Sequence, residues 1–94
     1  MTNKARLIDR IENANASIKE YKNSVKTLEK HYNALVDYSA KNGGCLNMHD
    51  FGCEVESEIS ACNEKIAELK ADIKKMKRQI ALIEELEKIE YGVA

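Results

Sequence analysis

The sequence predicts an all-α fold: an antiparallel two-helix coiled-coil hairpin that oligomerises into a helical bundle. Three observations support this prediction. The 94 residues contain no proline, so the strongest helix breaker is absent throughout. Charged residues make up 33% of the chain, among runs of Ala, Glu, Lys, Leu and Ile that are typical of long helices. In both halves, apolar residues recur at alternating steps of four and three, which is the spacing of a helical heptad repeat and not of a strand.

The first helix is predicted over about residues 3–41. Thr2 or Asn3 can cap its free amides, and Gly43 can end it in the left-handed conformation. Its apolar stripe consists of Leu7, Ile11, Ala14, Ile18, Tyr21, Val25, Leu28, Tyr32 and Leu35.

The second helix is predicted over about residues 54–91, after a loop over about 42–53, so that residues 1–94 form a single helical-hairpin domain. Glu54, Glu56 and Glu58 would lie in its first turns, where the helix dipole favours negative charge. Its apolar stripe consists of Val55, Ile59, Cys62, Ile66, Leu69, Ile73, Met76, Ile80 and Ile83.

The two stripes match when the chain is folded back at Asn47. Residues whose numbers add up to 94 then face each other, for example Tyr32 and Cys62, or Lys4 and Glu90. This register also sets the basic start of the first helix beside the acidic end of the second. A shift by one heptad is the competing register, because it pairs the same kinds of position.

Five apolar residues lie off the paired stripes, toward the open end of the hairpin. We expect them to form an interface with a second copy or another protein, since large exposed apolar patches mark association surfaces. The alternative is that the second helix rotates and wraps them around Leu7 within one chain. They are Ile8, Leu82, Leu86, Ile89 and Val93.

The segment KNGGCLNMHDFGCE, residues 41–54, holds a Cys-x3-His-x3-Cys set made of Cys45, His49 and Cys53. Structural zinc sites use four ligands and a tighter cysteine spacing, so no metal ligand or cofactor is predicted here. A Cys45–Cys53 disulfide and a thiol-reactive site are the alternatives. Cys62 falls in the apolar stripe, where a thiol acts as a small hydrophobe.

A capped turn is the preferred interpretation of the same segment. Asn47 or Asp50 would cap the second helix. Leu46, Met48 and Phe51 would fold over Leu35, Val36 and Ile59, and Met48 and Phe51 would also be available to a partner at the loop tip.

A basic belt is predicted on the second helix, with Lys19, Lys22 and Lys26 roughly opposite on the first. Such a belt can bind phosphates or an acidic protein. The alternative is a solvated helix exterior, because Glu64, Glu68 and Asp72 are interspersed. The belt consists of Lys70, Lys74, Lys75, Lys77 and Arg78.

Together these features favour a non-enzymatic protein–protein interaction module, such as a small adaptor, inhibitor or assembly factor. Its expected partners are a second copy of itself and another protein. A nucleic-acid-binding protein that uses the basic belt is a second hypothesis, and a metal-binding or thiol-reactive loop is a third. The formal net charge is −1 and no run of about 18 apolar residues occurs, so we expect no membrane partner. Without a secretory signal pattern, a cytoplasmic location is expected.

Overall fold

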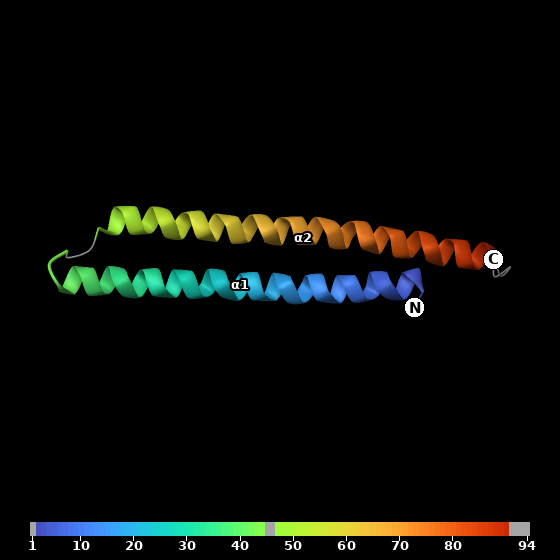
Figure 1. Cartoon of the computed structure of the whole chain (residues 1–94), viewed down its shortest axis with the longest axis horizontal. Helices are drawn as coiled ribbons and strands as arrows, with labels where there is room; N and C mark the ends of the chain where they lie inside the picture. The colour runs from blue at the N-terminus through green and yellow to red at the C-terminus, as the bar shows by residue number, and fades with distance from the viewer. Residues whose placement is uncertain (1, 45–46, 91–94) are drawn as a thin grey trace.

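The computed structural model describes residues 2–44 and 47–90, which form two long α-helices joined by a short connection. Helix α1 spans Asn3–Lys41 and helix α2 spans Met48–Glu90. The helices lie side by side in opposite directions (Figure 1), and the molecule measures 75 × 19 × 16 Å. The all-helical prediction is therefore confirmed.

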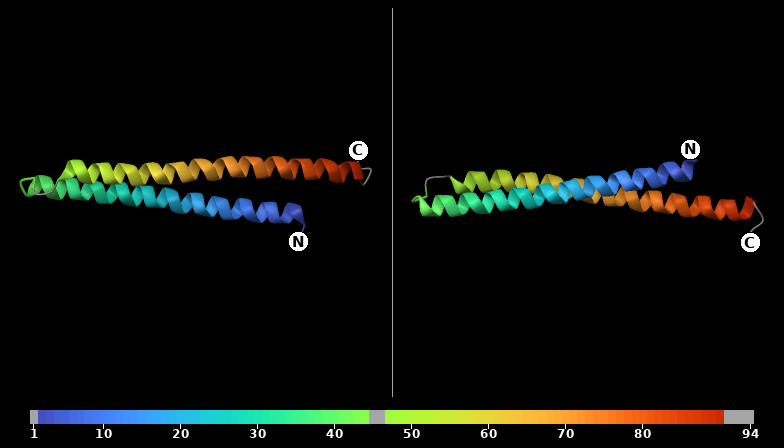
Figure 2. Two further views of the ribbon diagram at one scale, coloured as in Figure 1. Left: turned by 45° about the horizontal axis from the view of Figure 1, so that its top comes forward. Right: turned by 90° about the horizontal axis from the view of Figure 1, so that it is seen from below.

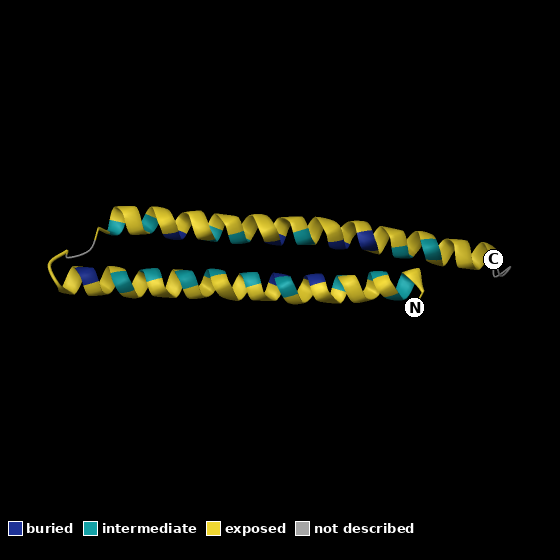
Figure 3. Ribbon diagram, in the orientation of Figure 1, coloured by how far each residue is buried: buried dark blue, intermediate teal, exposed yellow. Residues whose placement is uncertain are grey.

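The predicted apolar stripes form the contact between the helices. The buried residues of both helices face each other along the pair, and the outer sides are exposed (Figure 3). Figure 2 shows that the helices cross at a shallow angle. The core cluster consists of Ala14, Ile18, Ile66, Ile73 and Met76, with Leu7, Ile11, Tyr21 and Leu69 packed against it.

Both ends of α1 are capped as predicted. The Thr2 hydroxyl accepts a hydrogen bond from the Ala5 amide at 3.1 Å, which satisfies one of the free N–H groups of the first turn. At the other end, Gly43 has φ 71° and Gly44 has φ 74°. The Gly44 amide donates to the Ser39 carbonyl at 2.7 Å, which is the long bond of a Schellman motif.

Helix α2 begins at Met48, about six residues before the predicted start near residue 54. Asn47 explains the early start, because its side-chain oxygen accepts from the Asp50 amide at 3.3 Å. Its amide group also donates to the Asp50 carboxylate at 2.8 Å, so the predicted capping role falls to Asn47, with Asp50 as its partner. The acidic residue of the first turn is Asp50. Glu54, Glu56 and Glu58, which were expected in the first turns, begin only in the second turn because α2 starts earlier than predicted.

The earlier start shortens the connection and changes the register. Lys4 forms an ion pair with Glu84 at 3.3 Å, where the predicted register placed Glu90. Tyr32 lies against Gly52 and not Cys62. The numbers of two residues that face each other thus add up to 84–88 and not to 94. The predicted register was therefore wrong by about one heptad. The competing register is the one that the structure adopts.

An aromatic contact closes the pair next to the connection. The rings of Tyr32 and Phe51 stack with centroids 6.4 Å apart and planes 6° from parallel. Gly52 makes room for this arrangement, because a Cβ atom there would lie 3.1 Å from the Tyr32 hydroxyl oxygen. The ring of Phe51, which was expected over Leu35, Val36 and Ile59, thus meets Tyr32, a contact that was not predicted. Leu46, the third residue of that expected cluster, lies outside the described residues.

Candidate interaction surface

Helix α2 extends past the beginning of α1. Because Lys4 pairs with Glu84, residues 85–90 have no facing turn of α1 among the described residues (Figure 1). Three large apolar side chains of this end of α2 are exposed: Leu82 by 54%, Leu86 by 59% and Ile89 by 76%. These values are high for side chains whose burial is each worth about 1.5–3 kcal/mol.

The three side chains lie on one side of α2. Steps of four and three residues return to nearly the same direction on a helix of 3.6 residues per turn. If Ile66, Ile73 and Ile80 are the a positions of the heptads, then Leu82 and Ile89 take position c and Leu86 takes position g. We call Leu82, Leu86 and Ile89 the overhang stripe. Val93, predicted to continue it, lies outside the described residues.

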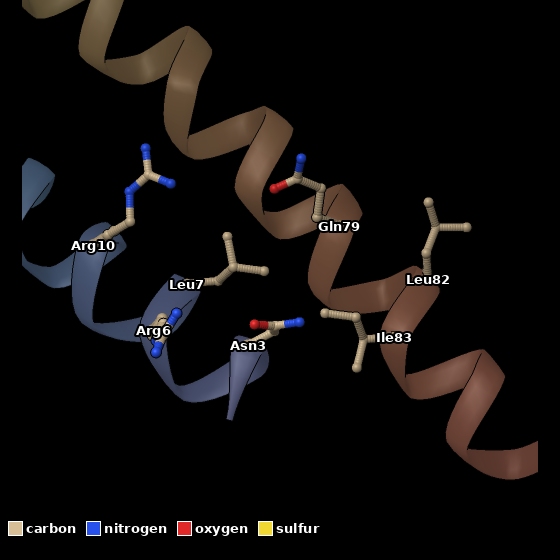
Figure 4. A pocket seen from close by; sticks show the side chains of 7 residues that line it. All are labelled: Asn3, Arg6, Leu7, Arg10, Gln79, Leu82 and Ile83. Atoms are coloured by element: carbon tan, nitrogen blue, oxygen red, sulfur yellow. The ribbon is translucent and has the colours of Figure 1, made fainter. Parts of the chain in front are cut away.

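An open groove of about 450 Å³ borders the overhang stripe. In Figure 4, Leu7 from α1 and Ile83 from α2 point into the space between the helices, and Leu82 points away from α1. Polar and basic side chains line the rest. The lining residues are Asn3, Arg6, Leu7, Arg10, Gln79, Leu82 and Ile83.

The predicted interface residue Ile8 lies elsewhere on the pair. It is 44% exposed but does not line the groove. With Ile11 at position a, Ile8 takes position e, whereas the groove residues Asn3, Arg6 and Arg10 take positions g and c. Positions e and g flank the contact on opposite sides. The structure therefore brings Leu82, Leu86 and Ile89 together and separates Ile8 from them.

Opposite charges gather at this end of the molecule. Arg6 and Arg10 border the groove. Glu85, Glu87 and Glu90, all exposed, belong to the overhanging turns of α2. Lys4 and Glu84, which are 34% and 50% exposed, form the one ion pair between the helices in the described chain. The arginines and the other carboxylates are thus not engaged with each other.

The loop candidates are placed only in part. Cys45 lies outside the described residues, and His49 and Cys53 are exposed one turn apart in the first turns of α2. Cys53 is a free thiol, as is the half-buried Cys62. Among residues 2–44 and 47–90, no group of three or more His, Cys, Asp and Glu side chains is arranged to hold a metal ion. Of the predicted loop-tip contacts, Met48 is half-buried and Phe51 is 37% exposed.

The predicted basic belt does not form one surface. All five of its residues are exposed. Lys70, Lys74 and Lys77 lie within about 60° of one another around α2, whereas Lys75 is about 140° from Lys70, at about 100° per residue. Arg78 lies between the two directions. Three lysines of the belt thus lie on one side of α2. Arg78 lies at the border of that side, and Lys75 lies on another side.

No family model, curated protein or solved structure matches this chain. In the part of the chain that the structure describes, neither helix contains a stretch apolar enough to cross a membrane.

Proposed function

We propose that this chain is a non-enzymatic protein–protein interaction module, built as a helical hairpin that pairs with a second copy of itself through the overhang stripe. The observation that carries the proposal is the exposure of Leu82, Leu86 and Ile89 at the end of α2, where residues 85–90 have no facing turn of α1 among the described residues. Water contact at such a continuous apolar stripe is unfavourable, and association removes it.

A second copy fits this surface by shape. If two α2 helices run antiparallel about a twofold axis near Leu86, then Leu86 faces its own copy and Leu82 faces Ile89. The overhang of each chain then covers the groove of the other chain. Both contacts form at once, as an isologous interface requires. The arrangement brings four helices together, with coiled-coil packing inside each pair and between the two α2 ends.

A second copy also fits by charge. The overhang carries Glu85, Glu87 and Glu90, and the groove is bordered by Arg6 and Arg10. In the twofold arrangement, the carboxylates of one chain approach the arginines of the other. Such exposed pairs contribute little stability, but they favour this orientation over one that sets like charges together. An adaptor, inhibitor or assembly role would then use the surfaces that the dimer leaves free.

Sedimentation equilibrium tests this proposal with Leu86→Glu and the control Ile8→Glu. Leu86→Glu removes two apolar contacts at the twofold axis and sets two carboxylates against each other, so we expect dissociation to become at least 100-fold easier. Two Leu side chains of about 1.5 kcal/mol each would account for that change. Ile8→Glu has the same charge change on the opposite flank, and we expect it to leave the dimer intact.

Both variants should keep the helical circular dichroism of the wild type, because both sites are exposed. A wild-type chain that is monomeric at 100 μM would refute the dimer. An equal effect of the two variants would show that the overhang stripe is not its interface.

A further inference from the structure

One flank of the helix pair is rich in lysines and carries few carboxylates. This flank consists of heptad positions e and b of both helices. It carries no acidic residue between Glu12 and Glu29 of α1, or between Glu56 and Glu84 of α2. We call the charged residues in these stretches the lysine face: Lys19, Lys22, Lys26, Lys70, Lys74 and Lys77.

The observed register sets the lysines of the two helices in series. Arg10 and Gln79 line one groove, so Lys77 lies near the level of Arg10 and Lys70 near that of Ser17. The lysines of α1 continue from Lys19 to Lys26. The row spans about 16 residues, or about 24 Å at 1.5 Å per residue, with one lysine about every 5 Å. Glu12 is the one carboxylate of this flank within that span. In the predicted register the two sets would have overlapped and not followed each other.

The lysine face is free to bind an anion. All six side chains are exposed. The ion pairs among the described residues join Lys4 to Glu84 and Lys65 to Glu68, so neither involves the lysine face. The opposite flank, positions c and g over the same length, carries four carboxylates and two lysines: Glu20, Glu58, Glu68, Asp72, Lys65 and Lys75. The chain is thus polarised across its width, although its net charge is only −1.

We propose that the lysine face binds the phosphate backbone of a nucleic-acid duplex without regard to base sequence. A row of lysines about 5 Å apart, three from each helix, can follow a line of phosphates, which recur every 3.4 Å along each strand of B-DNA. The uncharged residues of the flank in these stretches are small or polar: Asn15, Ser60, Asn63, Ala67 and Ala81. Single-strand binding uses aromatic side chains for base stacking, and the face offers none in these described stretches.

The same composition argues against a membrane surface as the partner. Helices that lie on membranes place large apolar side chains next to their lysines, so that these enter the lipid. Here the apolar a and d residues beside the lysine face are turned into the contact between the helices. The overhang stripe lies on the other flank, so binding at the lysine face does not depend on the proposed dimer.

Fluorescence anisotropy with a labelled 25-base-pair DNA duplex tests the inference between 50 and 200 mM NaCl. Contact with six phosphates gives a slope of log K against log salt of about −5, and three contacts give about −3. We expect the triple variant Lys70→Gln, Lys74→Gln and Lys77→Gln to move the slope by at least 2 and to weaken binding at least tenfold at 50 mM NaCl.

The matched control is Lys30→Gln, Lys65→Gln and Lys75→Gln, which removes the same charge from other positions. We expect it to bind within about threefold of the wild type, and a second duplex of unrelated sequence to bind equally well. The inference is overturned if the wild type does not bind duplex DNA, or if the control loses as much affinity as the lysine-face variant. Preferential binding to phosphatidylserine vesicles under the same conditions would overturn it too.

Discussion

The position of the core is tested most sharply by one substitution made at two isoleucines of α2. Ile73 is 8% exposed and packs in the cluster with Ala14, Ile18, Ile66 and Met76. Ile89 is 76% exposed on the overhang. Ile→Ala at a buried site costs about 2–5 kcal/mol, because the lost burial and the cavity add up. At Ile89 only about a quarter of the side chain is covered, so the same change should cost under about 0.5 kcal/mol in the monomer.

The measurement is urea unfolding followed by circular dichroism, in a Leu86→Glu background so that association does not contribute. We expect Ile73→Ala to lower the free energy of unfolding by about 3 kcal/mol. If Ile73→Ala is unfolded in buffer, then Ile73→Val, at about 0.5–1.5 kcal/mol, gives the measurable step. An unchanged m-value confirms that the same surface unfolds. Equal losses at Ile73 and Ile89 would refute the reasoning, because burial would then not separate the two sites.

Two further predictions concern the ends of the helices that meet at the connection. Gly43→Ala should destabilise the chain by about 1 kcal/mol through backbone strain alone, because φ is 71° and a Cβ atom would meet nothing within 4 Å. If urea unfolding gives the same free energy of unfolding for this variant as for the wild type, the left-handed C′ position is not needed. Asn47→Ala should cost about 1 kcal/mol and Asn47→Asp should cost much less, since Asp also caps; equal losses in thermal melts would mean that the Asn47 side chain does not hold the start of α2.

The sequence allowed the facing residues of each helix to be predicted, but not their partners. Heptad spacing identified the residues that lie between the helices, since Ile18, Ile66 and Ile73 are all buried as their positions required. The same repeat makes registers one heptad apart look alike. The choice depends on where α2 begins, and that depends on a capping side chain at Asn47 and on a glycine that is tolerated inside the helix.

The candidate site depended on that register. The overhang exists because α1 begins opposite Glu84, and the predicted register would have covered residues 85–90 with the first turns of α1. The stripe was recognisable from its spacing alone, but its separation from Ile8 was not. Heptad positions c and e both look like exposed positions in the sequence, and only the side on which the partner helix lies distinguishes them. The same ambiguity placed Lys75 in the basic belt.

The fit of Tyr32 to Gly52 has a consequence for how the chain folds. The two residues are 20 positions apart and lie next to the connection, so their contact closes a short loop and can form early. A hairpin that zips from this point has its alignment chosen before the distant turns meet. With a larger side chain at residue 52, the Tyr32 ring would have to shift, because even a Cβ atom there would lie 3.1 Å from its hydroxyl oxygen. Pairings one heptad apart would then become closer in free energy. Hairpins shifted by one heptad would then form more often and would have to open before they could align correctly. Gly52 thus favours folding to a single alignment of the two helices.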